Sequence, residues 1–100
     1  MQGCYNDVDS DRAIPLLEGQ SLYLYGDHGS REEAILKCYK AANAKGYTFF
    51  AVQDGGLCLS SSDAESTFKR YGASTHCDSN GKGGDLANNV YEIKGIIIAV

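Results

Sequence analysis

Four cysteines spread over a short chain constrain the fold more than any other feature of the sequence. None of Cys4, Cys38, Cys58 and Cys77 lies within ten residues of another, whereas zinc sites usually draw ligands from close cysteine pairs. An even number of widely spaced cysteines in 100 residues is typical of a disulfide-linked secreted domain. We therefore expect two disulfides and a secreted, extracellular location. The alternative is four buried free thiols in a cytosolic protein.

Length and charge narrow the function classes. A chain of 100 residues is enough for one domain and not for two, so we expect a single domain over residues 1–100. The net charge is −4, and no basic cluster exceeds the pair Lys69 and Arg70. A nucleic-acid binder needs a concentrated basic face to release counterions, so no nucleic-acid partner is expected. Residues 95–100 are apolar but too few to cross a bilayer, so no membrane insertion is expected.

A principal helix is expected from residue 30 to Gly46. Ser30-Arg31-Glu32-Glu33 has the form of a capping box, in which the serine accepts from a free amide and the glutamate reaches back. An apolar stripe at helical spacing follows, formed by Ile35, Cys38, Tyr39 and Ala42. Gly46 stands where a left-handed residue commonly ends a helix.

The remaining elements predict a mixed fold. A second capping box, Ser62-Asp63-Ala64-Glu65, predicts a short surface helix that stops at Gly72. In residues 21–25, alternation places Leu22 and Leu24 on one strand face and the two tyrosines on the other. Strands are expected at residues 21–25, 47–53, 57–59, 89–94 and 96–100, with a hairpin turn at Asp54-Gly55-Gly56. We predict an α+β fold: a small antiparallel sheet covered by one principal helix, plus a short second helix.

These elements also suggest which cysteines pair. Cys38 lies on the apolar stripe of the principal helix, and Cys58 lies in the return strand of the hairpin beneath it. We predict a Cys38–Cys58 disulfide and, from the remaining pair, Cys4–Cys77. Four cysteines allow three pairings, so the connectivity is a hypothesis.

Part of the chain resembles a known family. Gly3-Cys4-Tyr5-x-Asp7, Arg12-Ala13-Ile14-Pro15, the helix cysteine Cys38, Lys45-Gly46-Tyr47, Phe50-Ala51-Val52-Gln53 and Cys58 together resemble WSC domains. Tyr71-Gly72, Cys77 and residues 83–91 are similar to secreted marine-invertebrate domains with the same opening. WSC domains are extracellular cysteine-rich modules related in shape to PAN/apple domains and widely regarded as carbohydrate-binding. The resemblance therefore implies a small secreted fold and a sugar ligand, although this chain has fewer cysteines than is usual and no tryptophan.

No pattern in the sequence indicates catalysis. His28 and His76 are the only histidines, and no nucleophile, metalloprotease or phosphate-loop motif is present. We therefore expect that the protein is not an enzyme.

Two segments carry acidic and amide residues of the kind that bind calcium. Asp7, Asp9, Asp11 and Glu18 have the spacing of an EF-hand loop, but Arg12 replaces its turn glycine and no helix precedes it. We interpret that segment as a solvated acidic turn. The late loop offers Asp78, Asn80 and Asp85 between glycines. These are equally consistent with a calcium site and with a plain loop.

A sugar site needs an aromatic ring against the apolar sugar face and planar polar groups for the hydroxyls. The candidates are Tyr23, Tyr25, Gln53, Asp54, Asp85, Asn88 and Asn89. We expect a lectin-like protein whose weak sites act together through self-association, with the apolar residues 95–100 as the pairing strand that makes a homodimer. The alternative is an extracellular matrix or receptor interaction module that binds no sugar.

Overall fold

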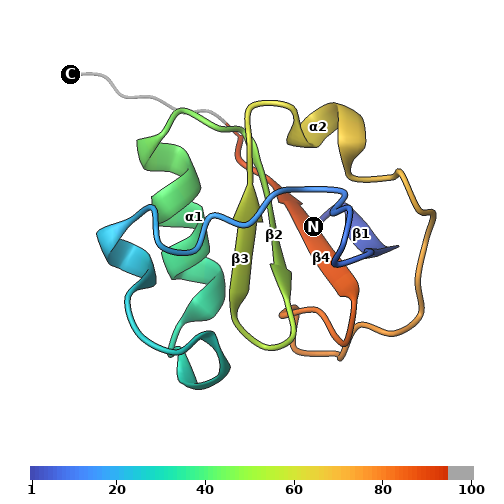
Figure 1. Cartoon of the computed structure of the whole chain (residues 1–100), viewed down its shortest axis with the longest axis horizontal. Helices are drawn as coiled ribbons and strands as arrows, with labels where there is room; N and C mark the ends of the chain where they lie inside the picture. The colour runs from blue at the N-terminus through green and yellow to red at the C-terminus, as the bar shows by residue number, and fades with distance from the viewer. Residues whose placement is uncertain (95–100) are drawn as a thin grey trace.

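The computed structural model describes residues 1–94, which form an α+β fold around a four-stranded sheet (Figure 1). In chain order, the elements are β1 (Gly3–Asn6), the 3₁₀ turns η1 (Leu22–Leu24) and η2 (His28–Ser30), α1 (Ala34–Ala44), β2 (Phe49–Gln53), β3 (Leu57–Ser60), α2 (Ala64–Thr67) and β4 (Ala87–Glu92). The strand order is β1-β4-β2-β3, and every neighbouring pair is antiparallel. The predicted fold class is confirmed. The pairing strand expected at residues 96–100 lies outside the described residues.

The sheet is covered on both faces, with β2 near its middle. All five residues of β2 are buried. Phe50 and Val52 pack into a cluster beneath α1, whereas Phe49 and Ala51 pack into a second cluster with residues of α2. Because side chains alternate along a strand, this one strand contributes to both cores. Figure 1 shows α1 beside the sheet on the left and α2 above the upper ends of β2 and β4.

The β2–β3 hairpin forms as expected. Asp54 and Gly55 have positive φ values of 54° and 86°, and Gly56 N donates to Gln53 O at 3.1 Å. Positive φ at both central residues is what a type I′ turn requires, and this turn matches the twist of the flanking strands.

Both predicted disulfides are present. The Cys38–Cys58 disulfide joins the buried face of α1 to β3, and the Cys4–Cys77 disulfide joins β1 to the long segment before β4. Both links close loops in the unfolded chain, of 73 residues for Cys4–Cys77 and 20 for Cys38–Cys58, and so reduce its conformational entropy.

The principal helix starts later than its sequence suggests. Ser30 ends η2, and α1 begins at Ala34 after Glu33, which adopts a left-handed φ of 51°. Arg31 between them is buried, so the chain turns it inward instead of winding residues 30–33 into a helical turn. The expected stop at Gly46 is confirmed, with a φ of 80°. The second capping box also fails, because α2 begins at Ala64 with Asp63 at its N-cap and no side-chain hydrogen bond caps it.

Two strand expectations need correction. Residues 21–25 form the 3₁₀ turn η1 in place of a strand, so Leu24 is buried while Leu22 is 91% exposed. Conversely, β1 was expected as a loop but pairs with β4, with Cys4 opposite Asn89. Its short length and single alternation gave little periodic signal, and its pairing partner lies more than eighty residues away in the chain.

Candidate functional site

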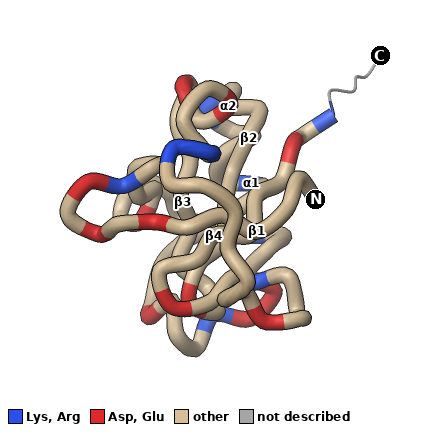
Figure 2. The backbone as a smooth tube through the Cα atoms, turned by 90° about the vertical axis from the view of Figure 1, so that its right-hand side faces the viewer, with Lys and Arg blue, Asp and Glu red and all other residues tan. Residues whose placement is uncertain are grey.

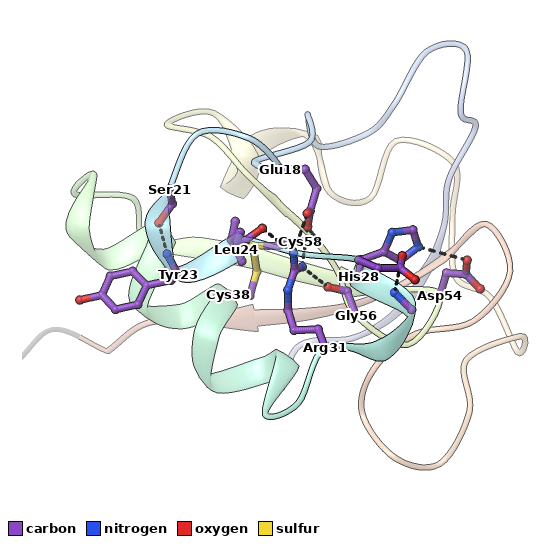
Figure 3. A network of polar contacts seen from close by, with 12 residues as sticks. Glu18, Ser21, Tyr23, Leu24, His28, Arg31, Cys38, Asp54, Gly56 and Cys58 are labelled. Atoms are coloured by element: carbon purple, nitrogen blue, oxygen red, sulfur yellow. Dashed lines mark hydrogen bonds and ion pairs between the residues drawn. A yellow bond between two sulfur atoms is a disulfide. The ribbon is translucent and has the colours of Figure 1, made fainter.

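One buried arginine holds residues 19–33 against the hairpin (Figure 3). Arg31 makes a two-pronged contact with Glu18, at 2.7 Å from Nη1 and 2.8 Å from Nη2. The same two nitrogens donate to Gly56 O and Leu24 O, each at 2.7 Å. Only 1% of the Arg31 side chain is exposed, so these are shielded, charge-assisted hydrogen bonds. They tie η1 and the loop before α1 to the turn between β2 and β3.

Glu18 is the matching anion. Burial raises the pKa of Glu18. Hydrogen bonds from Arg31 and from the Cys58 amide, together with the charge of Arg31, lower it by more, so the net pKa lies below that of a free glutamate side chain. The Cys58 amide donates to Glu18 Oε2 at 2.8 Å. Glu18 therefore stays ionised at neutral pH and links the arginine to β3 beside the Cys38–Cys58 disulfide.

The turn η2 lies directly on the hairpin. A Cβ added to Gly56 would stand 2.1 Å from His28 O, so only glycine permits this approach of the two backbones. His28 Nε2 lies 3.6 Å from Asp54 Oδ2, which gives an ion pair when the imidazole is protonated. Figure 3 shows His28 and Asp54 pointing toward one another at the edge of this network.

A surface depression of about 250 Å³ lies between residues 25–32 of this loop and Lys37 in the first turn of α1. We call it the Tyr25 depression; its lining is formed by Tyr25, Gly26, Asp27, Ser30, Arg31, Glu32 and Lys37. Tyr25 is 77% exposed. Asp27 Oδ1 caps η2 by accepting from the Gly29 amide at 3.2 Å. An exposed ring therefore stands beside two carboxylates, a hydroxyl and an ammonium group.

The two tyrosines of the predicted site lie on the same loop but not at the same place. Tyr25 lines the depression, whereas Tyr23 is 45% exposed and has Lys40 Nζ 5.9 Å from its ring centre. Their exposure comes from the 3₁₀ turn and not from strand alternation, because Leu22 beside them is also exposed.

The predicted amides Gln53, Asn88 and Asn89 are buried, which corrects their assignment as sugar contacts. Gln53 Nε2 donates to Asn88 Oδ1 and to Asp7 Oδ2, both at 2.8 Å. Asn89 Oδ1 accepts from the Gly83 amide at 2.7 Å. The exposed fractions of the three amides are 3%, 0% and 2%, so these groups bond to the protein itself.

Asp7 has a structural role, contrary to the solvated turn expected for its segment. It is 5% exposed, and it accepts from Arg12 Nη1 at 2.9 Å and from the Ala13 amide at 2.8 Å. With the bond from Gln53, these contacts join the segment after β1 to the ends of β2 and β4. Asp7 and Glu18 thus belong to separate polar networks and do not form one loop of ligands.

The remaining predicted polar residues, Asp54, Asp78, Asn80 and Asp85, are exposed. The late loop that carries three of them is not an open loop of flexible glycines. A Cβ on Gly84 would lie 1.9 Å from His76 O, so its backbone is tightly packed. Within residues 1–94, no group of three or more His, Cys, Asp or Glu side chains is arranged to hold a metal ion.

Figure 2 shows Lys and Arg positions scattered among Asp and Glu positions along the described chain. Among the helices of residues 1–94, none is long and apolar enough to span a membrane.

Sequence reasoning missed Asp27, Ser30, Glu32 and Lys37 as site residues. Ser30 and Glu32 had been assigned to a helix cap and its first turn, and Lys37 to the helix surface. The available signal was the Tyr25-Gly26-Asp27 run, in which a turn-forming glycine and aspartate directly follow an aromatic residue.

Comparisons with known proteins add no relative: no family model, no curated protein and no solved structure matches this chain.

Proposed function

We propose that this protein binds carbohydrate, without catalysis, at the Tyr25 depression. The observation that carries the proposal is the exposed Tyr25 ring beside a depression rimmed by Asp27, Ser30, Glu32 and Lys37. An aromatic face packs against the apolar face of a sugar ring, and carboxylate, hydroxyl and ammonium groups bond its hydroxyls. The depression is shallow and small, so each site binds weakly.

Preorganisation of the loop supports the proposal. Arg31 bonds Leu24 O, directly before Tyr25, and Gly56 O in the turn between β2 and β3, so it fixes this loop against the hairpin. A binding loop that is already ordered loses less conformational entropy when a ligand arrives. Two disulfides are consistent with an oxidising environment, and we extend this to a secreted protein, as the resemblance to WSC domains implies. Useful avidity would then come from self-association.

A glycan array with the purified protein tests the proposal, using Tyr25→Ala, Asp27→Asn and the matched control Tyr23→Ala. We expect selective binding to one sugar class that free sugar competes. Tyr25→Ala should weaken this binding about tenfold, because the stacking contact is lost. Asp27→Asn keeps the cap acceptor for Gly29 and removes only the charge. Tyr23→Ala should leave binding unchanged, since its ring lies outside the depression lining.

Two other outcomes would count against the proposal. Equal losses from the two tyrosine variants would move the site away from the depression. A blank array, measured with added calcium and again with a chelator, would exclude a sugar ligand whether or not calcium is needed.

The second candidate is a protein-interaction module, which the exposed side chain of Leu22 favours. Leu22 is 91% exposed on η1, next to the exposed Tyr23, and contiguous exposed apolar side chains mark sites that contact another protein. A blank array together with a monodisperse monomer by light scattering would support this module over a multivalent lectin.

A further inference from the structure

A second concave surface lies on the other side of α1, away from the Tyr25 depression. It is a groove of about 500 Å³ between α1 and the end of β4. We call it the α1–β4 groove; its apolar lining is formed by Ile35, Leu36, Tyr39, Phe50, Tyr91 and Ile93.

The groove presents aromatic and aliphatic surface to solvent. Phe50 and Tyr91 stack with ring centres 5.1 Å apart, and Tyr39 tilts toward Phe50 at 6.4 Å. The Tyr91 hydroxyl donates to Gly81 O at 2.6 Å, so its polar atom is already satisfied. Leu36 and Tyr39 on the helix side are 43% and 36% exposed. Apolar surface that is gathered in a groove gains from being covered.

An apolar segment follows the last groove residue in the sequence. Ile93 and Lys94 line it, and the next six residues are Gly95-Ile96-Ile97-Ile98-Ala99-Val100, none of which has a polar side chain. Six extended residues reach about 20 Å. The helix residues of the lining, from Ile35 to Tyr39, span only about 6 Å along α1.

We propose that residues 95–100 dock into the α1–β4 groove of their own chain. Three observations favour this occupant: the segment starts at the groove's edge, its side chains match the lining, and its length is sufficient. A covalent tether also gives an effective concentration of about millimolar or higher, which a separate partner would have to exceed. Glu92 and Lys94, the two charged residues of the lining, form an ion pair with each other at 3.2 Å, so their charges offset one another beside the apolar side chains.

Thermal unfolding of six chains, two parent chains and four variants, tests the docking without any sugar ligand. Leu36→Ser is made in the full chain and in a chain that ends at Lys94, and Leu22→Ser is made in both as the matched exposed-leucine control. We expect Leu36→Ser to lower the Tm of the full chain by about 5 °C, because it removes a covered contact. In the shortened chain the same change should shift Tm by no more than about 1 °C. Leu22→Ser should shift neither chain.

A substitution within residues 95–100 tests the docking in the full chain, even if the shortened chain does not fold. Ile97→Ser in the full chain should lower Tm, and its effect should not add to that of Leu36→Ser, since the two residues would share one contact. Equal Leu36→Ser shifts in both chain lengths, or full additivity with Ile97→Ser, would overturn the docking.

Light scattering separates the two ways in which the segment could be covered. The expected coupling, with an oligomeric state that does not change when residues 95–100 are removed, supports docking within one chain. A dimer that becomes a monomer on removal of residues 95–100 overturns the proposal and assigns the segment to a second copy. Neither result depends on sugar binding at the Tyr25 depression.

Discussion

Residues 19–33 and residues 78–89 are both polar and glycine-containing, and both pack against the β2–β3 turn, yet they use their polar groups in opposite ways. In the first segment, Arg31 bonds the backbone from within, so side chains such as Tyr25 and Asp27 remain at the surface. In the second, Asn88 and Asn89 turn inward and bond the protein. A polar segment thus offers a ligand site only when something else satisfies its backbone.

The largest expected effect comes from substituting one glycine in each segment by alanine. Gly26 and Gly83 have similar φ values of 81° and 74°, but a Cβ on Gly26 meets open space while one on Gly83 lies 2.3 Å from Val52 O. Gly26→Ala should cost about 1 kcal/mol for the left-handed backbone alone. Gly83→Ala should cost at least about 4 kcal/mol or prevent folding. Urea unfolding followed by circular dichroism measures the free energy of unfolding of both variants. Similar losses would show that the backbone of residues 78–89 can shift to accommodate a methyl group.

The second largest effect should come from removing the arginine of the first segment. Arg31→Met leaves Glu18 without its cation and two carbonyls without a donor, so we expect a loss of about 3 kcal/mol of unfolding free energy. Adding Glu18→Gln should recover part of that loss, because the uncompensated charge disappears.

Arg70→Met is the matched control for that experiment. Arg70 pairs with Asp11 at 3.3 Å, but both side chains are largely exposed, so the free energy of unfolding should hardly change. A comparable loss of unfolding free energy in the two arginine variants would mean that the buried contacts of Arg31 stabilise the fold no more than an exposed ion pair does.

A smaller effect concerns pH. The pKa of Glu18 is lowered in the folded protein below 4.5, so its contribution to stability is full above pH 4.5 and is lost as pH falls below that value, through the folded pKa. Glu18→Gln should therefore flatten the fall of the urea midpoint in that acidic range. Glu65→Gln removes an exposed carboxylate on α2 and controls for the change in net charge. An unchanged acid profile in Glu18→Gln would refute the assignment.

The smallest effect tests the start of α1. Glu33 is held at a φ of 51°, a conformation that asparagine tolerates better than glutamate. Glu33→Asn should raise the free energy of unfolding by up to about 1 kcal/mol. Its neighbour Glu32 does not have a positive φ, so Glu32→Asn should give no such gain in the same urea titration. If the two variants behave alike, the left-handed start of α1 does not limit stability.

Much of the fold could be predicted from local patterns. The buried positions of Cys38 and Ala42 on α1, the glycine at Gly46 and the Asp54-Gly55-Gly56 turn follow from patterns over a few residues, and each is confirmed. Tyr39 of the predicted apolar stripe is exposed instead. The two disulfides followed from placing Cys38 and Cys58 on elements that must pack together.

The errors share one physical origin. The serine at residue 30 fits a helix cap locally, but the energy of burying Arg31 against Glu18, which lies thirteen residues earlier, overrides it. Residues 21–25 alternate like a strand, but Pro15 and Leu17 already bond the outer edge of β3, and Leu24 is buried by a 3₁₀ turn.

The sequence by itself determined the class of fold and the supply of polar and aromatic residues for a binding site, and it indicated the pairing of the cysteines that the structure shows. Only the tertiary structure decided which of those residues face water. Gln53, Asn88 and Asn89 were indistinguishable in the sequence from surface ligand groups, and they are inside because Asp7, Gly83 and their strand neighbours offer them bonds. Tyr25 is outside on a loop in which Arg31 satisfies the preceding carbonyl, Leu24 O, and also bonds Gly56 O of the β2–β3 turn. Exposure depends on partners that are distant in the chain, so no local pattern encodes it.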